Sequence, residues 1–244
     1  MLRRHRGTEH MIRACFFDLD GTLQDSEVLW VEASRQYLRD LGVELAPSVV
    51  QDIVYGHGWG EVFQGLARHA PALSSQGWAA TADALRLYYL RLCDAGGIAI
   101  PGSVALLRRL ARTVPVAIVS GATRHDIAAS IGQLGIGDCL QFFIGAEDYG
   151  TGKPCPDCYR LAAERLRTPP ADCLVFEDST AGVNAAKAAG MRCVALALPG
   201  HPAQDLRGAD LILPDLGSFQ IDDLDAATER RHNPLRRTSQ PCTS

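Results

Sequence analysis

One stretch near the N-terminus decides the fold: residues 14–22 read ACFFDLDGT. Its first residues are apolar and run into two carboxylates and a glycine, which is typical of a buried strand that ends in a tight turn. Side chains alternate along a strand with a period of two, so Asp18 and Asp20 lie on the same side of its end. The stretch therefore predicts a buried strand that carries a pair of carboxylates.

The same apolar pattern recurs along the chain. Further strands are expected at residues 114–120, 141–144, 173–177, 193–198 and, more weakly, 210–213. Helical patterns, with apolar residues three and four apart, separate them at residues 104–112, 124–134, 157–167 and 181–189. Strands that alternate with helices of this length predict parallel βαβ units with right-handed crossovers. We expect an α/β fold with a doubly wound parallel sheet, a Rossmann-like core.

Residues 26–95 break this alternation, because they contain amphipathic helical stretches and no convincing strand. The expected helices cover residues 29–41, 49–55, 60–68 and 78–93. Gly- and Pro-containing turns separate them, which indicates a helical domain inserted after the first strand. We predict a discontinuous core of residues 12–25 and 96–225, with residues 26–95 as the inserted domain.

Composition limits the class of protein. The chain has 244 residues, is 47% hydrophobic and carries a formal net charge of −4. This acidic balance argues against a nucleic-acid partner bound through its phosphates, and no apolar run approaches the ~20 residues of a membrane span. We expect a cytoplasmic monomer that binds neither nucleic acid nor membrane, with flexible polar termini at residues 1–11 and 226–244.

The chain has eight cysteines, mostly inside apolar segments, which suits reduced, buried thiols. Cys155 and Cys158 form a C-x-x-C pair. No second pair or nearby histidine completes a zinc site, so we interpret the spacing as chance rather than as a redox or metal motif.

Polar residues stand where the predicted strands end. In an open parallel sheet these carboxyl ends meet at one edge, so side chains that are distant in sequence converge there. The residues are Asp18 and Asp20 after the first strand, Ser120 and Gly121 after the second, Glu177 and Asp178 after the fourth, and Lys153 just before a helix. Clustered carboxylates are costly without a cation, and an oxygen-rich site that also takes a phosphate suits Mg²⁺.

The other strand-end groups suit an anion. Ser120 and Gly121 lead into a helix that begins near Thr123, so a hydroxyl and backbone N–H groups can face an anion there. Lys153 lies between Gly152 and a proline, in a setting where a lysine can balance both a carboxylate and a phosphoryl oxygen.

Four segments together carry a family resemblance. In chain order they read FFDLDGTLQDSE, AIVSGAT, GKPCPDCY and VFEDSTAGVNAAKAAGM. In order and spacing the chain resembles the haloacid dehalogenase superfamily over about residues 12–215, and within it the phosphatase and β-phosphoglucomutase-like branch. The resemblance implies a helical cap inserted after the first motif, at the position that the helical pattern indicates.

The resemblance also implies roles for individual residues. Asp18 is expected to be the nucleophile that takes the phosphoryl group as an aspartyl phosphate, and Asp20 the general acid that later activates water as a base. Expected to bind the phosphate group, or to support the loop that does so, are Thr22, Ser120, Gly121 and Lys153. Mg²⁺ is expected to be held by Asp18, the backbone carbonyl of Asp20 and Asp178, with Glu177 beside them.

The expected function is Mg²⁺-dependent hydrolysis of a small phosphorylated metabolite, such as a sugar phosphate. Asp20 favours this reaction, because dehalogenase and phosphonatase members of the superfamily lack an acid at that position. A sugar phosphomutase of the β-phosphoglucomutase type is the nearest alternative, and a catalytically idle binding or regulatory member is another. Mutases carry a cap histidine and an arginine where this chain places Trp30 and Trp59, with His57 close by, so these three residues are candidate substrate contacts.

Overall fold

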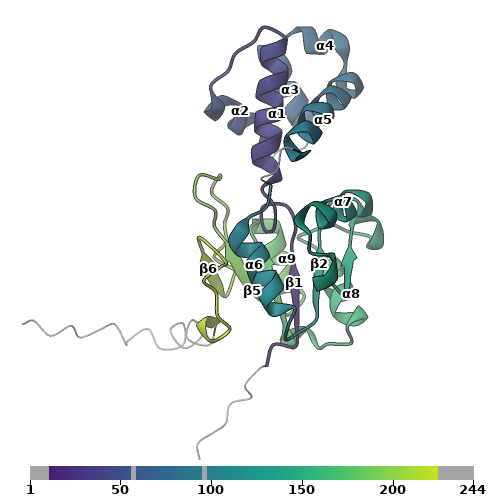
Figure 1. Cartoon of the computed structure of the whole chain (residues 1–244), viewed down its shortest axis with the longest axis vertical. Helices are drawn as coiled ribbons and strands as arrows, with labels where there is room; N and C mark the ends of the chain where they lie inside the picture. Colours follow the sequence, from purple (N-terminus) through teal and green to yellow (C-terminus); the bar gives the residue numbers. More distant parts are fainter. Residues whose placement is uncertain (1–10, 56–58, 95–97, 225–244) are drawn as a thin grey trace, which may run out of the picture. The chain divides into compact units, whose positions relative to one another are not determined.

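The computed structural model describes residues 11–55, 59–94 and 98–224 (Figure 1). The chain divides into two compact units. Unit 1 consists of Met1–Thr22 and Pro101–Ser244, and unit 2 is Leu23–Ile100. The predicted inserted domain, residues 26–95, falls within unit 2, whereas the predicted flexible termini lie almost entirely outside the described residues.

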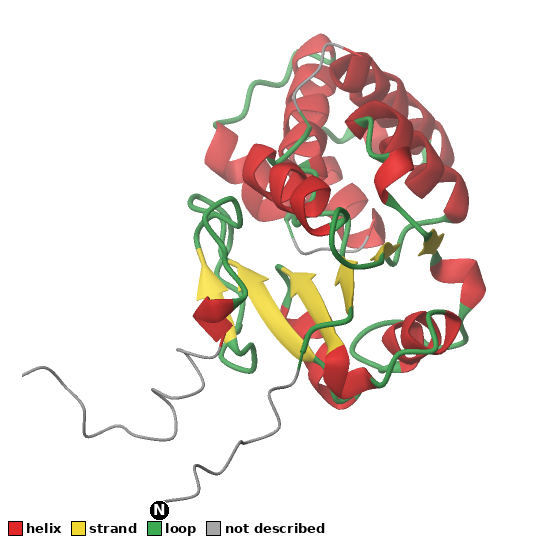
Figure 2. Cartoon of the chain, turned by 60° about the horizontal axis from the view of Figure 1, so that its bottom comes forward, coloured by secondary structure: helices red, strands yellow, loops and turns green. Residues whose placement is uncertain are grey.

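Unit 1 is built on a six-stranded sheet in which every neighbouring pair is parallel. Its strands are β1 (Ala14–Phe17), β2 (Val116–Val119), β3 (Phe142–Ile144), β4 (Cys173–Glu177), β5 (Arg192–Leu196) and β6 (Leu211–Leu213). Their order is β3-β2-β1-β4-β5-β6, and Figure 2 shows them side by side as yellow arrows. The chain runs outward from β1 on both sides, so β1 and β4 mark the switch point at which ligands bind in such sheets.

Helices cover both faces of this sheet, which confirms the predicted doubly wound fold. Unit 1 contains α6 (Pro101–Leu110), α7 (Arg124–Leu134), α8 (Asp157–Arg165) and α9 (Thr180–Ala188). Phe16 and Val175 on one face pack in a buried cluster with Tyr159 of α8 and Val183 of α9. Figure 1 shows α6 over the opposite face. Because both faces are covered, the central strands are apolar throughout.

The opposite face carries an aromatic group of its own. The rings of Phe17 and Phe176, on adjacent strands, stack with their centroids 4.4 Å apart. Phe219 meets Phe176 edge to face at 5.4 Å. These contacts fix the pair β1 and β4 directly beneath the carboxylates that follow them in the chain.

The helix ends follow local sequence signals. The Thr123 side chain accepts a hydrogen bond from the Asp126 N–H and caps α7, which ends at Gly135 with a positive φ of 61°. Ser179 caps α9 in the same way through the Gly182 N–H. Three short 3₁₀ helices, η1 (Gly137–Cys139), η2 (Ala146–Asp148) and η3 (Pro170–Asp172), were not predicted.

Unit 2 is helical, as the sequence predicts. Its helices are α1 (Ser26–Asp40), α2 (Pro47–Val54), α3 (Trp59–His69), α4 (Ala72–Gln76) and α5 (Trp78–Asp94). They share a buried core that includes Leu38, Leu66, Leu73 and Leu85. The two ends of the unit meet, because the Asp25 N–H donates to the Ile98 carbonyl and the Ile100 N–H donates to the Leu23 carbonyl. The short helix α4 is the one element of this unit that the pattern did not predict.

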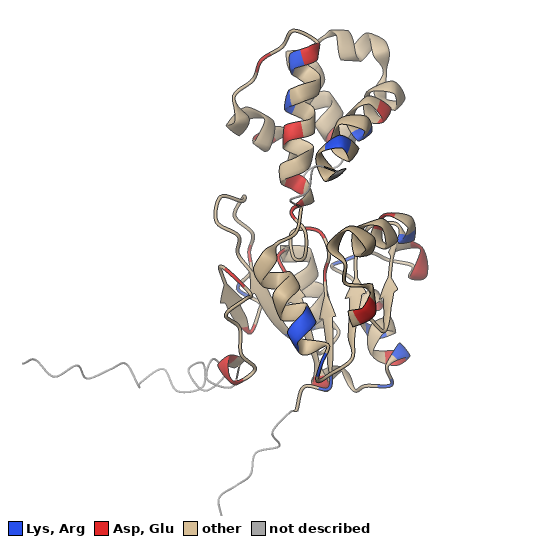
Figure 3. Ribbon diagram, viewed as in Figure 1, with Lys and Arg blue, Asp and Glu red and all other residues tan. Residues whose placement is uncertain are grey.

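The distribution of charged residues, the character of the helices and the state of the cysteines can be compared with the sequence predictions. Figure 3 shows Lys/Arg and Asp/Glu positions interspersed along the described helices and strands of both units. None of the helices in the described ranges combines the length and the apolar character that crossing a bilayer requires. The seven cysteines among the described residues are all free thiols, and five of them are buried.

Candidate active site

The register of the central strands brings polar groups to one level of the sheet. Phe17 of β1 pairs with Phe176 of β4, so Asp18 and Glu177 come next on the two strands. Val119, the last residue of β2, stands at the same level on the other side of β1. The carboxyl ends of three adjacent strands thus present two carboxylates and a backbone carbonyl side by side.

A single cation, Lys153, joins these three strand ends. Its Nζ donates to Asp18 Oδ1 at 2.5 Å, to Glu177 Oε1 at 2.6 Å and to the Val119 carbonyl at 3.1 Å. An ammonium group has three N–H donors, so all three are used. The side chain is 11% exposed, and its Nζ lies 5.1 Å from the ring centroid of Tyr159.

Glu177 is fully buried and its carboxylate is saturated with donors. Oε1 accepts from Lys153 and, at 2.8 Å, from the Tyr159 hydroxyl. Oε2 accepts from the Asp178 N–H at 3.1 Å and from the Ser179 N–H and hydroxyl at 3.3 and 3.1 Å. Since a carboxylate offers about four lone-pair sites, these five hydrogen bonds leave no acceptor capacity for another ligand.

Asp178 is held by the turn that follows β1. The Thr22 hydroxyl donates to Asp178 Oδ1 at 3.0 Å. Gly21 has a φ of +82°, and a Cβ atom there would lie 2.1 Å from Asp178 Oδ2, so this position requires glycine. The turn after β1 and the loop after β4 therefore pack directly against each other.

Among the described residues, Asp18, Glu177 and Asp178 bring their carboxylates close enough together for a metal ion, and since Glu177 is already saturated, Asp18 and Asp178 are the two that could bind it. One carboxylate oxygen from each lies within 4.8 Å of the others. Against these three carboxylates the cluster contains one ammonium group, that of Lys153, within hydrogen-bond distance. The excess of negative charge matches the charge of a divalent cation.

The pKa values reflect burial and this ion cluster. Burial raises the pKa of Asp18 well above its ordinary value, although Lys153 acts in the opposite direction. Burial also raises the pKa of Glu177, but Lys153 and Tyr159 outweigh it and the net shift is downward. Burial lowers the pKa of Lys153, yet its two carboxylate partners raise it above the ordinary value. Glu177 and Lys153 are thus held in their charged forms.

The remaining predicted residues of unit 1 lie at the same strand ends. Asp20 is half-buried in the turn two residues beyond Asp18. Ser120 is buried, and its Oγ accepts from the Ala122 N–H at 3.0 Å. Gly121 is exposed, and no atom lies within 4 Å of where its Cβ would stand. The space beside this backbone segment is open to a ligand.

The predicted substrate contacts Trp30, His57 and Trp59 belong to unit 2 rather than to the strand ends of unit 1. Trp30, on α1, stacks on Tyr89 with ring centroids 4.0 Å apart and packs against the core of unit 2. Trp59 is the first residue of α3, and His57 lies outside the described residues. Trp30 thus packs within unit 2.

Several groups of this site were not predicted from the sequence. Tyr159, Ser179 and the Val119 carbonyl hold the cluster, but none of them stands out by pattern. Gly182 does carry a signal, because glycine inside a helix is unfavourable and often marks a close approach. A Cβ atom at Gly182 would lie 1.9 Å from Glu177 Cδ, so α9 approaches the buried carboxylate too closely for any side chain.

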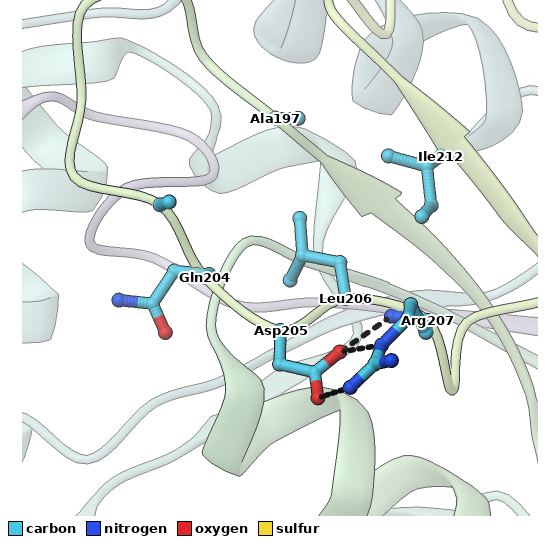
Figure 4. Close-up of a pocket in the computed structure, with 7 residues that line it drawn as sticks. Ala197, Gln204, Asp205, Leu206, Arg207 and Ile212 are labelled. Carbon is cyan, nitrogen blue, oxygen red and sulfur yellow. Dashed lines mark hydrogen bonds and ion pairs between the residues drawn. The ribbon is translucent and has the colours of Figure 1, made fainter.

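A pocket of about 500 Å³ lies on the loop between β5 and β6 (Figure 4). Its lining consists of Ala197, Ala203, Gln204, Asp205, Leu206, Arg207 and Ile212. It shares no residue with the cluster around Lys153. Its loop nevertheless supports the site, because Gln204 Oε1 accepts from the N–H and hydroxyl of Thr180 in the first turn of α9.

These features define a class of protein: a doubly wound α/β protein whose carboxylate and lysine cluster lies at the switch point of the sheet, with a helical unit inserted after the first strand. A family model described as haloacid dehalogenase-like hydrolase matches residues 12–190. The chain belongs to the haloacid dehalogenase-like hydrolase family. This confirms the predicted family, fold and enzyme class.

Known proteins similar to this chain include phosphatases. Hexitol phosphatase A of Escherichia coli (strain K12) is 35% identical over 213 residues, covering 84% of this chain and 92% of the relative. Validoxylamine A 7'-phosphate phosphatase of Streptomyces hygroscopicus subsp. limoneus is 32% identical over 207 residues, covering 84% and 95%. A solved HAD family hydrolase of Deinococcus radiodurans R1, with bound phosphate and sodium, is 27% identical with a TM-score of 0.72, covering 90% and 98%.

The close approach of Gly182 to the Glu177 carboxylate predicts that a side chain at this position lowers stability. Gly182→Ala should lower the free energy of unfolding by about 1–3 kcal/mol, because the new methyl group displaces the Glu177 carboxylate from its five donors. Gly132→Ala is the matched control: it also lies in a helix, but it is exposed with no atom near its Cβ position. This control should be unchanged or more stable by about 0.5–1 kcal/mol. Urea unfolding of both variants makes the comparison, and equal effects would contradict the assignment.

Proposed function

We propose that the chain is a Mg²⁺-dependent phosphatase that hydrolyses a small phosphorylated sugar, sugar alcohol or similar metabolite through an aspartyl phosphate on Asp18. The observation that carries the proposal is the largely buried Lys153, held between Asp18 and Glu177, two carboxylates that lie in one group with Asp178. An anionic nucleophile can approach an anionic phosphate only where positive charge offsets the repulsion. The names of the two phosphatase relatives, which specify a hexitol and a 7'-phosphate, support the substrate class.

Asp18 is the carboxylate best suited to be the nucleophile. Glu177 has no acceptor capacity left, and Asp178 is held by Thr22. Lys153 engages only Oδ1 of Asp18, and no other described residue donates to this carboxylate. In the proposed first step an oxygen of Asp18 bonds to phosphorus and the ester oxygen leaves with its electron pair.

Asp20 is proposed to give the proton that the departing alkoxide needs. Sugar and polyol alkoxides are poor leaving groups, so a proton donor accelerates their departure. In the second step Asp20 takes a proton from water, which attacks the aspartyl phosphate and releases phosphate and free Asp18. Its half-buried position in the turn leaves it accessible to both the leaving group and water.

The phosphoryl oxygens are proposed to bind at the end of β2. The Ser120 hydroxyl and the Gly121 backbone N–H stand just before α7, whose N-terminus favours an anion. Lys153 supplies the charge beside them, and Thr22 supports the site by holding Asp178.

The donor set suits Mg²⁺, since it consists of carboxylate oxygens and carries excess negative charge. Asp18, Asp178 and the backbone carbonyl of Asp20 are proposed to hold the ion, with Glu177 beside them as the partner of Lys153. When bound, Mg²⁺ would offset the charge of the phosphoryl group and of Asp18.

The helical unit is proposed to select the substrate, with Trp30, His57 and Trp59 as its candidate contacts. A sugar phosphomutase and a catalytically idle binding member are the alternatives that the following experiments separate from the phosphatase. The cytoplasmic location and the monomeric state stay predictions from the sequence.

Removal of the metal should abolish the reaction. Release of phosphate from p-nitrophenyl phosphate should cease in excess EDTA and return when Mg²⁺ is added. Ca²⁺ should substitute poorly, because it prefers more ligands and a looser geometry. Full turnover in excess EDTA would exclude the proposed metal dependence, and no turnover under any condition by folded protein would favour the binding member.

Substitution of Asp18 and of Asp20 should have different effects on esters with good and with poor leaving groups. Asp18→Asn should abolish cleavage of both a hexitol phosphate and p-nitrophenyl phosphate. Asp20→Asn should slow hexitol phosphate cleavage by ~10²–10⁴-fold. It should slow formation of the aspartyl phosphate from p-nitrophenyl phosphate much less, because p-nitrophenolate leaves without a proton. Asp138→Asn, at an exposed position in η1, is the control and should match the unmodified enzyme.

Mass spectrometry of the Asp20→Asn protein, mixed with p-nitrophenyl phosphate, locates the intermediate. The phosphoryl group should accumulate on Asp18, because the base that activates water has been removed. Label on any other residue would contradict the nucleophile assignment. Transfer of the group to a second hydroxyl of a hexose phosphate, in place of release to water, would favour the mutase.

A further inference from the structure

The buried hydroxyl of Tyr159 has no role in the reaction as described so far. Tyr159 lies on α8, is fully buried, and donates to Glu177 Oε1 at 2.8 Å. Its ring also lies beneath the Lys153 ammonium, with 5.1 Å between Nζ and the ring centroid. Burial first, and the nearby Glu177 charge second, raise the pKa of Tyr159 well above its ordinary value, so the hydroxyl keeps its proton.

Lys153 has no N–H group available for a phosphoryl oxygen in the structure. All three N–H groups of Lys153 are taken by Asp18, Val119 and Glu177. A phosphoryl oxygen therefore gains an N–H from Lys153 only if one of these acceptors gives it up. The Val119 carbonyl is fixed at the end of β2, and Glu177 is fixed by its other donors.

Asp18 is the acceptor that can release Lys153. When an Asp18 oxygen bonds to phosphorus, the carboxylate loses its negative charge and becomes a weaker partner for an ammonium. The negative charge of Asp18 passes to the departing ester oxygen, while the phosphoryl oxygens keep theirs and so become the stronger partner for the ammonium. The exchange requires that Lys153 stay in place on its other two acceptors.

We propose that Tyr159 is a positioning residue, whose hydroxyl holds Glu177 so that Lys153 stays anchored on Glu177 and Val119 while its third N–H passes from Asp18 to a phosphoryl oxygen. The inference rests on the proposed function. Without the hydroxyl, Glu177 Oε1 has Lys153 as its one remaining donor and draws the ammonium more strongly. The lysine then supports the transition state less well, although the ground-state contacts through Ser120, Gly121 and the metal are kept.

Tyr159→Phe tests this, because it removes the hydroxyl and keeps the ring. We expect kcat with p-nitrophenyl phosphate at saturating Mg²⁺ to fall about tenfold and KM to stay within about twofold, the pattern of a contribution made only in the transition state. Tyr37→Phe is the matched control. Tyr37 is also buried, and its hydroxyl donates to Gln76 Oε1 at 2.9 Å in the helical unit.

The control separates positioning from stability. Both variants should lower Tm, Tyr159→Phe by more, because its hydrogen bond is buried and made to a carboxylate, whereas that of Tyr37 is partly exposed and made to an amide. Only Tyr159→Phe should lower kcat. An unchanged kcat in Tyr159→Phe, or an equal fall in Tyr37→Phe, would overturn the proposal.

A second readout does not depend on turnover. The chain has two lysines, Lys153 and Lys187, so a lysine-selective ¹⁵N NMR spectrum contains at most two ammonium signals. The ammonium signal of Lys153, identified by its absence in Lys153→Met, should shift or broaden in Tyr159→Phe and stay unchanged in Tyr37→Phe. An unchanged signal in Tyr159→Phe would overturn the positioning role. Absence of phosphatase activity in the unmodified protein would instead count against the proposed function and leave this readout intact.

Discussion

One largely buried ammonium group, that of Lys153, joins the ends of the three central strands. Its acceptors are Asp18 after β1, the carbonyl of Val119 at the end of β2, and Glu177 at the end of β4. Taking a lysine and two carboxylates out of water is costly, and only close, well-aligned partners offset the cost. The parallel register meets this condition, since it brings the three acceptors to one level of the sheet.

Burial of the Glu177 carboxylate in turn restricts which residues can surround it. The buried carboxylate needs donors on every side, and Ser179 and Tyr159 supply them from the helix cap of α9 and from α8. Because α9 approaches so closely, a side chain at position 182 would collide with the Glu177 carboxylate. The same logic holds at Gly21, where the turn after β1 passes against Asp178. The chemistry proposed for Asp18 thus depends also on two glycines, which leave room for the neighbouring carboxylates of Glu177 and Asp178.

Hydrophobic periodicity predicted the main elements, because burial on both faces of a parallel sheet produces apolar runs that helices separate. The predictions for β4 and α7 match the observed bounds, and β1 ends at Phe17, where the chain turns into the carboxylates. Helix α4 was missed because five residues are too few to reveal a period.

The site could be predicted only in part from the sequence. Asp18, Thr22, Lys153, Glu177 and Asp178 were expected to converge, and the structure brings them together. The Val119 carbonyl and the Tyr159 hydroxyl could not be predicted, since a backbone acceptor has no sequence signature and an aromatic residue in a helix usually indicates core packing. Which donors surround a buried charge is decided by tertiary contacts, and a single sequence does not record these.

Whether Lys153 and Glu177 act as one unit can be measured with a double-mutant cycle. The cycle compares the free energies of unfolding of Lys153→Met, Glu177→Gln and the double variant with that of the unmodified protein. Each single variant leaves a buried group without its partner, which typically costs about 3–5 kcal/mol for a buried pair. We expect a coupling energy of at least about 2 kcal/mol, with the double variant more stable than the sum of the single losses implies. Losses that add within about 0.5 kcal/mol would contradict it.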